Sequence, residues 1–212
     1  MSILITFEGI EGCGKSSQAK LLAEFLQAQC HSVFLTREPG GPPISEDIRK
    51  ILLDKHNKEM KPVTEVLLYS ASRSQHTLEW IKPALEAGKI VICDRYYDST
   101  YAYQGVARNI DMESVEYLTR FATGGLEPDI TFLIDLPAET GLSRIHTDSA
   151  DRLELEDLDF HQRVRNGFLS VAKRFPRRYI IINGKGTIDE IFVEITKSLE
   201  QHPKFRSFTE KD

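Results

Sequence analysis

The feature that most constrains this chain is a phosphate-loop motif close to its start. The pattern G-x-x-x-x-G-K-[ST] is completed by Gly9, Gly14, Lys15 and Ser16. In such a loop the backbone N–H groups turn toward phosphate oxygens, the lysine reaches the outer phosphates, and the serine hydroxyl ligates Mg²⁺. The apolar run Ile3–Phe7 before the loop is typical of a buried strand, and apolar residues after it recur at helical spacing. A strand, this loop and a helix N-terminus together predict a nucleoside triphosphate site. The alternative is a glycine-rich turn that binds nothing.

Strands and helices alternate along the rest of the chain. Five short apolar runs are expected to be strands: Ile3–Phe7, Ser32–Thr36, Lys89–Asp94, Ile130–Asp135 and Arg178–Asn183. Apolar residues at helical spacing fill the gaps between the strands. The expected helices are one that starts near Lys15 and the ranges Ser45–Leu53, Pro62–Ala87, Met112–Thr123, Ala138–His146, Leu158–Arg174 and Ile188–Glu200. A kink is expected at Pro83. This order predicts right-handed crossovers and an α/β fold, a doubly wound five-stranded parallel sheet flanked by helices. At 212 residues, we expect one domain over 1–212.

Charge and cysteine content narrow the class of protein. Lys and Arg number 27 against 32 Asp and Glu, which gives a net charge of −5 and disfavours binding to nucleic acid or to a membrane surface. No apolar stretch approaches membrane length, and no basic-then-apolar leader opens the chain. The three cysteines have neither disulfide nor metal spacing. We therefore expect a cytoplasmic protein that acts on small molecules.

Polar residues follow the strands, where ligands bind in open α/β sheets. In "CDRYYDSTYAYQG", Asp94 ends an apolar run at the position that holds Mg²⁺ in phosphate-loop enzymes, and Arg95 suits a phosphate. In "TREPGG", Arg37 offers another anion contact and Pro39 fixes the turn, with a cis bond as one option. The alternative for Asp94 and Arg95 is a solvated strand end. The alternative for Arg37 is an ordinary turn with a surface arginine.

A long predicted helix carries "LLYSASRSQH". Tyr69 and Arg73 are four residues apart, so they share one helix face and can line one pocket. A ring beside a guanidinium offers a flat heterocycle both a stacking surface and in-plane donors. The alternative is that Tyr69 is an ordinary core residue.

The polar stretch "RIHTDSADRLELED" interrupts the next helical pattern. Arg144 and Arg152 are candidates for a lid, over about 144–156, that closes on the transferring phosphate and excludes water. The alternative is an exposed loop whose arginines pair with Asp148 and Asp151.

Taken together, these motifs resemble the bacterial thymidylate kinase family. From Ile3 to about Ile195, "FEGIEGCGKSS", "TREPGG", "IRKILL", "LLYSASRSQH", "DRYYDSTYAYQG", "PDITFLIDLP" and "DRLE" follow the family's order. Many unrelated enzymes share the phosphate loop, but the combination of the other motifs is far more specific. The resemblance implies a nucleoside-monophosphate-kinase-like fold. It also implies transfer of the γ-phosphoryl group of ATP to dTMP, which gives dTDP and ADP for dTTP synthesis, with Mg²⁺ and in a homodimer.

The resemblance also implies roles for individual residues. ATP would contact the loop residues Gly9, Ile10, Glu11, Gly12, Cys13, Gly14, Lys15, Ser16 and Ser17. The acceptor dTMP would contact Glu11, Arg37, Arg49, Tyr69, Arg73, Arg95, Thr100, Tyr103 and Gln104. Catalysis would fall to Lys15, Arg95, Arg144 and Arg152, and Mg²⁺ would lie near Ser16, Asp94 and Glu11.

Within this set the resemblance implies a geometry for the acceptor. Tyr69 would stack on thymine, Arg73 would donate to its O4, and Tyr103 would crowd a 2′-hydroxyl. Glu11 would approach the sugar 3′-hydroxyl or its Mg²⁺. The residue after Glu11 is Gly12, and relatives without an arginine in the loop carry one in the lid instead.

This chain departs from the family pattern in three places. The lid has His146, Thr147 and Asp148 where many relatives have arginines. It is therefore open whether Arg144 or Arg152 acts on the transferring phosphate. Pro42 replaces a threonine, and Asn183-Gly184 replaces Asp-Ala near the expected adenine position.

Three other functions are considered. One is a phosphate-loop kinase for a different nucleotide or nucleoside, which Tyr69, Arg73 and Tyr103 disfavour. Another is a GTP switch protein, which the absence of D-x-x-G after a strand and of N-K-x-D disfavours. The third is a nucleotide-binding protein without catalysis.

Overall fold

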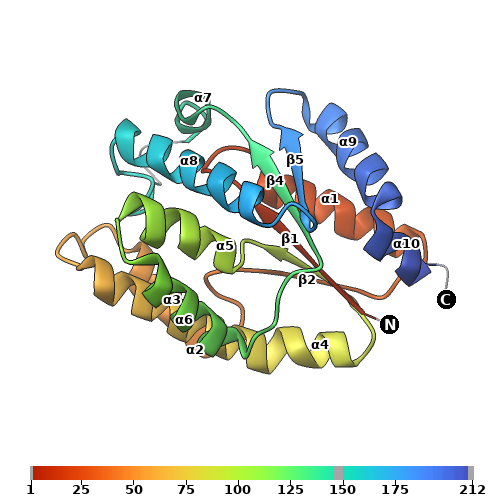
Figure 1. Cartoon of the computed structure of the whole chain (residues 1–212), viewed down its shortest axis with the longest axis horizontal. Helices are drawn as coiled ribbons and strands as arrows, with labels where there is room; N and C mark the ends of the chain where they lie inside the picture. The colour runs from red at the N-terminus through yellow and green to blue at the C-terminus, as the bar shows by residue number, and fades with distance from the viewer. Residues whose placement is uncertain (1, 146–149, 210–212) are drawn as a thin grey trace.

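The computed structural model describes residues 2–145 and 150–209. A five-stranded parallel sheet forms its centre, in the order β2-β3-β1-β4-β5 (Figure 1). The strands are β1 Ile3–Glu8, β2 Val33–Arg37, β3 Ile90–Asp94, β4 Ile130–Asp135 and β5 Tyr179–Asn183. Every end lies within one residue of the range expected from the sequence, so the predicted fold class is confirmed.

Burial explains why the three central strands are apolar throughout. Every side chain of β1 is buried. In β3 and β4 every side chain is buried except the terminal Asp94 and Asp135, which are partly exposed. The edge strands β2 and β5 are covered less completely, and Leu35 and Ile181 are exposed on them. Strands covered by helices on both faces have continuous apolar runs rather than alternating ones.

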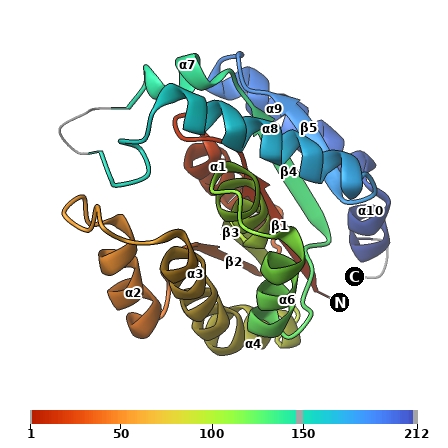
Figure 2. The ribbon, with the colours of Figure 1, turned by 60° about the vertical axis from the view of Figure 1, so that its left-hand side comes forward.

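The helices are α1 Lys15–Ala28, α2 Pro43–Leu53, α3 Pro62–His76, α4 Lys82–Glu86, α5 Tyr97–Thr100, α6 Met112–Thr123, α7 Ala138–Leu142, α8 Leu158–Arg174, α9 Ile188–Gln201 and α10 Pro203–Thr209. Two π-helical segments, η1 Thr77–Ile81 and η2 Tyr101–Ala107, join α3 to α4 and extend α5. On one face of the sheet α1 packs with α9 and α10. On the other, α3, α6, η2 and α8 pack together (Figures 1 and 2).

Two predicted helices differ in detail. The expected helix Pro62–Ala87 is one rod made of α3, η1 and α4, with π-helical winding in the turn before Pro83. Since proline lacks an N–H, it cannot continue the regular α-helical hydrogen bonding, and the winding changes in the turn before it. The helix expected to reach His146 ends as α7 at Leu142, and His146 lies outside the described residues.

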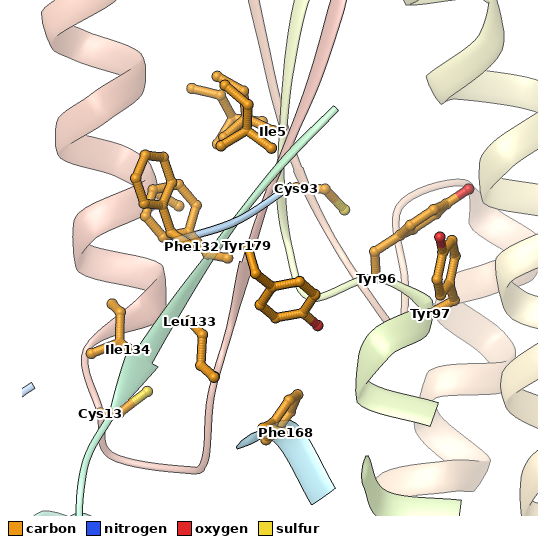
Figure 3. Packing of buried hydrophobic residues seen from close by; sticks show 14 of the residues in the cluster. Ile5, Cys13, Cys93, Tyr96, Tyr97, Phe132, Leu133, Ile134, Phe168 and Tyr179 are labelled. Atoms are coloured by element: carbon orange, nitrogen blue, oxygen red, sulfur yellow. The ribbon is translucent and has the colours of Figure 1, made fainter. Parts of the chain in front are cut away.

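The core joins the sheet to the phosphate loop. The rings of Phe7 on β1 and Phe132 on β4 stack with centroids 5.3 Å apart. Cys13 reaches down from the loop toward Ile134 on β4, while Phe168 of α8 lies on the other side of the sheet (Figure 3). Cys13 is only 1% exposed, so its thiol fills core space beneath the loop. The loop is therefore packed directly against the hydrophobic core.

Candidate active site

The C-terminal ends of three neighbouring strands form one site. In the sheet register Asp94 on β3 pairs with both Phe7 on β1 and Arg37 on β2. The N–H of Arg95 donates to the carbonyl of Phe7 at 2.9 Å, and the N–H of Glu38 donates to that of Asp94 at 2.9 Å. The segments after β1, β2 and β3 thus meet at one edge of the sheet, as the sequence predicts.

A cavity of about 270 Å³ opens at this edge. Many of the predicted site residues line it: Glu11, Gly12, Lys15, Ser16, Arg37, Arg49, Tyr69, Arg73, Asp94, Arg95, Thr100, Tyr103 and Gln104. Other predicted residues do not line it: Gly9, Ile10, Cys13, Gly14, Ser17, Arg144 and Arg152. The cavity therefore joins the phosphate loop to the region predicted for the acceptor.

The phosphate loop holds its own lysine. Lys15 is only 7% exposed, and its ammonium donates to the carbonyl of Ile10 at 2.7 Å. At the start of α1 the hydroxyl of Ser16 donates to Asp94 Oδ2. Asp94 Oδ1 is buried and has no hydrogen-bond partner among the described residues. A hydroxyl and a carboxylate oxygen therefore converge beside the loop, which is where a hard cation finds oxygen ligands.

The loop packs against α7 by close contact between two glycines. Gly12 has φ +68°, and a Cβ added there would lie 2.1 Å from the carbonyl oxygen of Gly141. Conversely, a Cβ on Gly141 would lie 2.4 Å from the carbonyl oxygen of Glu11. Arg144, three residues beyond Gly141, donates to the carbonyl of Gly12 at 3.2 Å. The start of the predicted lid is therefore attached to the phosphate loop.

Glu11 lies between Arg95 and Tyr103 in the middle of the cavity. The Tyr103 hydroxyl donates to Glu11 Oε2 at 2.6 Å, and Arg95 Nη2 donates to Oε1 at 2.9 Å. Burial alone would raise the pKa of Glu11, but the charge of Arg95, with His161 and Lys15, lowers it overall. Glu11 is therefore a carboxylate at neutral pH, and it lines the cavity.

Arg95 is held in an unusual backbone conformation. Its φ is +67°, a region that residues other than glycine rarely adopt. Its guanidinium donates to the carbonyl of Gly9 at 3.0 Å and to the Ser99 hydroxyl at 3.1 Å. Strained residues persist where the surroundings fix them, and they cluster at functional sites.

Arg73 belongs to a buried polar cluster that forms part of the cavity wall. Its Nε donates to Glu38 Oε2 at 2.7 Å and its Nη1 donates to the Thr100 hydroxyl at 2.8 Å. His76 lies 3.1 Å from Glu38 Oε1 and 2.7 Å from the hydroxyl of Thr36. Burial favours a raised pKa for Glu38, but Arg73 and His76 lower it. A fixed carboxylate thus orients the guanidinium toward the cavity.

Two further arginines, Arg37 and Arg49, line the cavity beside the turn at Pro39. Arg37 pairs with Glu46 at 2.8 Å, and Arg49 Nη1 donates to the carbonyl of Pro39 at 2.6 Å. Burial and the nearby charge of Arg37 lower the pKa of Arg49. The Glu38–Pro39 bond is cis, as the sequence analysis allowed. With Arg95, these residues make an anion-attracting end of the cavity.

The model of the thymidylate kinase family matches residues 7–195. The chain belongs to the thymidylate kinase family. It is 48% identical over 206 residues to the thymidylate kinase of Geotalea uraniireducens (strain Rf4), covering 94% of this chain and 97% of that one. It is 43% identical to that of Symbiobacterium thermophilum, covering 95% and 94%. The crystal structure of the Ehrlichia chaffeensis thymidylate kinase is similar, with a TM-score of 0.78 and 37% identity over 93% of this chain and 98% of that one.

Membership of the thymidylate kinase family gives the reaction, the ATP-dependent phosphorylation of dTMP to dTDP. The chain is thus an enzyme, a kinase with a small-molecule acceptor. The alternatives of a GTP switch protein and of a nucleotide-binding protein without catalysis are set aside.

The two arginines predicted for the lid, Arg144 and Arg152, do not line the cavity. Arg152 Nη1 pairs with Glu65 at 2.6 Å, and its Nε donates to the carbonyl of Leu52 at 3.0 Å. Because Arg152 is only 8% exposed, the alternative of an exposed loop arginine paired with Asp151 is wrong for this residue. The predicted features at His146, Thr147 and Asp148 lie outside the described residues.

Several cavity residues were not predicted. Glu38, Ser99 and Glu154 line it, and burial raises the pKa of Glu154. Glu38 stands inside "REPGG" and Glu154 inside "DRLE", so their motifs marked the segments. The sequence offered no signal for the partners of Glu38, because Arg73 and His76 lie on α3, more than thirty residues further along the chain.

Proposed function

We propose that dTMP and ATP bind end to end across the cavity, with their phosphates meeting near Arg95. One observation carries this proposal: Lys15 and Ser16 of the phosphate loop line the same cavity as Tyr69 and Arg73. A stacking ring and a guanidinium suit the thymine, and the phosphate loop suits the triphosphate. Little covalent work falls to the protein, since positioning and charge stabilisation dominate phosphoryl transfer.

The loop residues Gly9 to Ser17 would bind the ATP phosphates. The N–H groups at the start of α1 point toward them, and Lys15 would stabilise charge that develops on the transferred group. Ser16 and Asp94 would hold Mg²⁺, with Glu11 nearby, because the buried Asp94 Oδ1 lacks a partner among the described residues. When bound, the ion supplies positive charge to the phosphate oxygens.

The acceptor half would hold dTMP through a charged end and a flat end. Arg37, Arg49 and Arg95 would bind its phosphate. Tyr69 would stack on the base, with Arg73, Thr100 and Gln104 at its edge. Glu11 would accept a hydrogen bond from the 3′-hydroxyl, and the ring of Tyr103 would leave no room for a 2′-hydroxyl.

We further propose one domain over 1–212 with a lid over about 144–156. Arg144 and Arg152 would supply the positive charge that the loop lacks at Gly12. Arg144 already contacts the loop carbonyl of Gly12, whereas Arg152 would act only after leaving or reorienting its pair with Glu65.

A homodimer is proposed from an apolar face of α2, α3 and α6, which lie side by side (Figure 2). Large apolar side chains are exposed on these helices and on η1: Ile44, Ile51, Val63, Leu67, Leu78, Tyr117 and Phe121. Contiguous apolar surface of this kind marks interaction sites. Among the described residues no helix could cross a membrane. We place the enzyme in the cytoplasm, where free thiols such as its three remain reduced.

The acceptor base tests the assignment of Arg73. Thymine and uracil present an acceptor at position 4 and cytosine presents a donor, whereas Arg73 has only donors. We expect kcat/KM to fall roughly 10–200-fold from dTMP to dUMP and about 10⁴-fold to dCMP. Arg73→Ala should shrink the dTMP–dCMP gap far more than the dTMP–dUMP gap.

Arg177→Ala serves as the control, because Arg177 is exposed just before β5, at the end of the sheet away from the cavity. It should leave all three kcat/KM values unchanged. If the wild-type enzyme used dCMP as well as dUMP, the base contacts proposed for Arg73 would be wrong, and a broader nucleotide kinase would be favoured.

A further inference from the structure

The buried side chain of His161 has no part in the roles proposed above. It is 1% exposed, and among the described residues neither ring nitrogen has a hydrogen-bond partner. Buried polar groups are almost always paired, so an unpaired one needs an explanation. The nearby acceptor is Glu11, whose Oε2 lies 3.6 Å from His161 Nδ1.

The packing of α8 against η2 brings His161 to this position. His161 lies in the first turn of α8, and Gly167 lies further along the helix. A Cβ on Gly167 would be 2.9 Å from Ala102 Cα in η2, so only glycine allows the helices to approach this closely. The ring of Phe160 packs edge-on against the imidazole, with centroids 5.6 Å apart. The position of the imidazole beside Glu11 is therefore fixed by the fold.

Glu11 has two donors already and room for a third. Tyr103 donates to Oε2 and Arg95 donates to Oε1. An N–H on His161 Nδ1 faces the same carboxylate from the side of α8. The separation of 3.6 Å is a few tenths of an ångström longer than a hydrogen bond, and such contacts in a free enzyme tighten in the substrate complex.

We propose that His161 is a positioning residue, whose Nδ1–H donates to Glu11 Oε2 in the dTMP complex. Three donors would then fix the rotation of the carboxylate, so that its remaining lone pairs face the 3′-hydroxyl of the sugar. A carboxylate held in this way needs no reorganisation when the acceptor binds. This inference rests on the proposed function of Glu11 and adds the residue that orients it.

Two variants separate the N–H from the ring. His161→Phe keeps an aromatic ring and removes the donor, whereas His161→Asn places an amide N–H near the position of Nδ1. The measured quantity is the ratio of kcat/KM for dTMP to kcat/KM for 3′-deoxythymidine monophosphate. We expect His161→Phe to lower this ratio about tenfold, as for loss of one hydrogen bond to a charged group. His161→Asn should restore it to within about threefold of wild type.

Val164→Ala is the matched control, because Val164 is fully buried one turn further along α8. It should lower the melting temperature and leave the ratio unchanged. The proposal is overturned if His161→Phe keeps the wild-type ratio, if His161→Asn lowers it as much as His161→Phe, or if Val164→Ala lowers it equally.

Glu11→Gln separates this inference from the proposed function beneath it. If Glu11→Gln lowers the ratio and His161→Phe does not, only the role of His161 fails. If Glu11→Gln leaves the ratio unchanged, the proposed contact with the 3′-hydroxyl fails, and the role of His161 fails with it.

A second measurement is made on the wild-type enzyme. The variant His161→Asn is needed only to assign the signal to His161. The enzyme has six histidines, and it is labelled with ¹⁵N-histidine for NMR. When dTMP binds, one Nδ1-bound proton should become protected from exchange with water, and its resonance should shift downfield. The signal should be weaker with the 3′-deoxy compound and absent from His161→Asn. If no Nδ1 proton responds to dTMP, the hydrogen bond does not form and the proposal is wrong.

Discussion

At the scale of single residues, Lys15 combines two tasks in one side chain. Its ammonium is nearly buried and donates to the carbonyl of Ile10, which closes the loop, while the same group lines the cavity. Lys15→Ala should therefore lower kcat by at least about a hundredfold, since the lost charge acts on the transition state. Lys20→Ala is the control, because Lys20 is exposed on α1 and, among the described residues, pairs only with Glu24. A kcat within a few-fold of wild type for Lys15→Ala would contradict the assignment.

The buried carboxyl of Glu8 makes stability depend on pH. Burial and the nearby charge of Asp98 raise its pKa to about 8, against the lowering effect of Arg95. Between the pKa of the unfolded chain, near 4.5, and this value, the folded protein keeps a proton that the unfolded chain releases. The free energy of unfolding contributed by Glu8 is therefore full at low pH and lost as the pH rises toward 8.

Glu8→Gln removes this titration while keeping a hydrogen-bonding side chain beside Tyr96 and Ser99. From pH 5.5 to pH 8.5, urea denaturation should show wild type losing at least about 1.4 kcal/mol relative to the variant, the value of one pKa unit. An equal difference between the two proteins at both pH values would show that Glu8 is ionised throughout.

Sequence patterns predicted the residues that act through spacing or motif position. Tyr69 and Arg73 share a helix face, and Asp94 ends a buried strand, so both features were visible in the sequence. Glu38 and His76 were not predicted, because their importance comes from a mutual contact across 38 positions in the chain. His161 was missed for the same reason, since it meets Glu11 only through the packing of α8.

At the scale of elements, Glu65 on α3 joins the predicted lid segment to the residues proposed to bind the acceptor. It accepts hydrogen bonds from Gln104 at 2.8 Å and pairs with Arg152 at 2.6 Å and Arg108 at 3.3 Å. Arg108 in turn pairs with Glu156 at 2.6 Å. A single carboxylate thus ties η2, the segment after it and the lid segment to α3.

Arg152→Ala should lower kcat strongly, by about tenfold or more, because it removes a lid charge and leaves Glu65 buried with fewer partners. Arg144→Ala should have a smaller effect, and Arg152→Lys should rescue only in part, since lysine lacks the planar fork. Steady-state kinetics of the three variants decides the matter. Equal, small effects at 144 and 152 would show that this segment makes no contribution to transfer.

The regular elements were predictable and the irregular ones were not. All five strands follow from apolar runs, and α6 and α8 have the predicted ends. The segment from α5 into η2 is aromatic and polar without helical periodicity, because it faces the cavity, the core and α8 in turn. Functional segments break the simple pattern because several environments dictate their residues.

At the scale of the whole molecule, the apolar face on α6 predicts self-association. Tyr117 and Phe121 are 70% and 79% exposed and stack on each other with centroids 6.4 Å apart. Phe121→Glu would place a charge in the interface, where burying it is costly. We expect the wild type to sediment as a dimer and the variant to shift toward monomer. The exposed control Lys20→Ala should leave the sedimentation of the dimer unchanged, and a monomeric wild type would contradict the proposal.

The contact between Gly12 and Gly141 limits how this enzyme can change over evolutionary time. The resemblance to thymidylate kinases implies two arrangements, with an arginine either in the phosphate loop or in the lid. A single mutation to arginine at position 12 is closed to this chain, because even a Cβ would overlap the carbonyl of Gly141 at 2.1 Å and the backbone is left-handed there. A lineage starting here would first have to move α7 away from the loop. The close contact of Gly12 with Gly141 therefore couples the residue at position 12 to the position of α7.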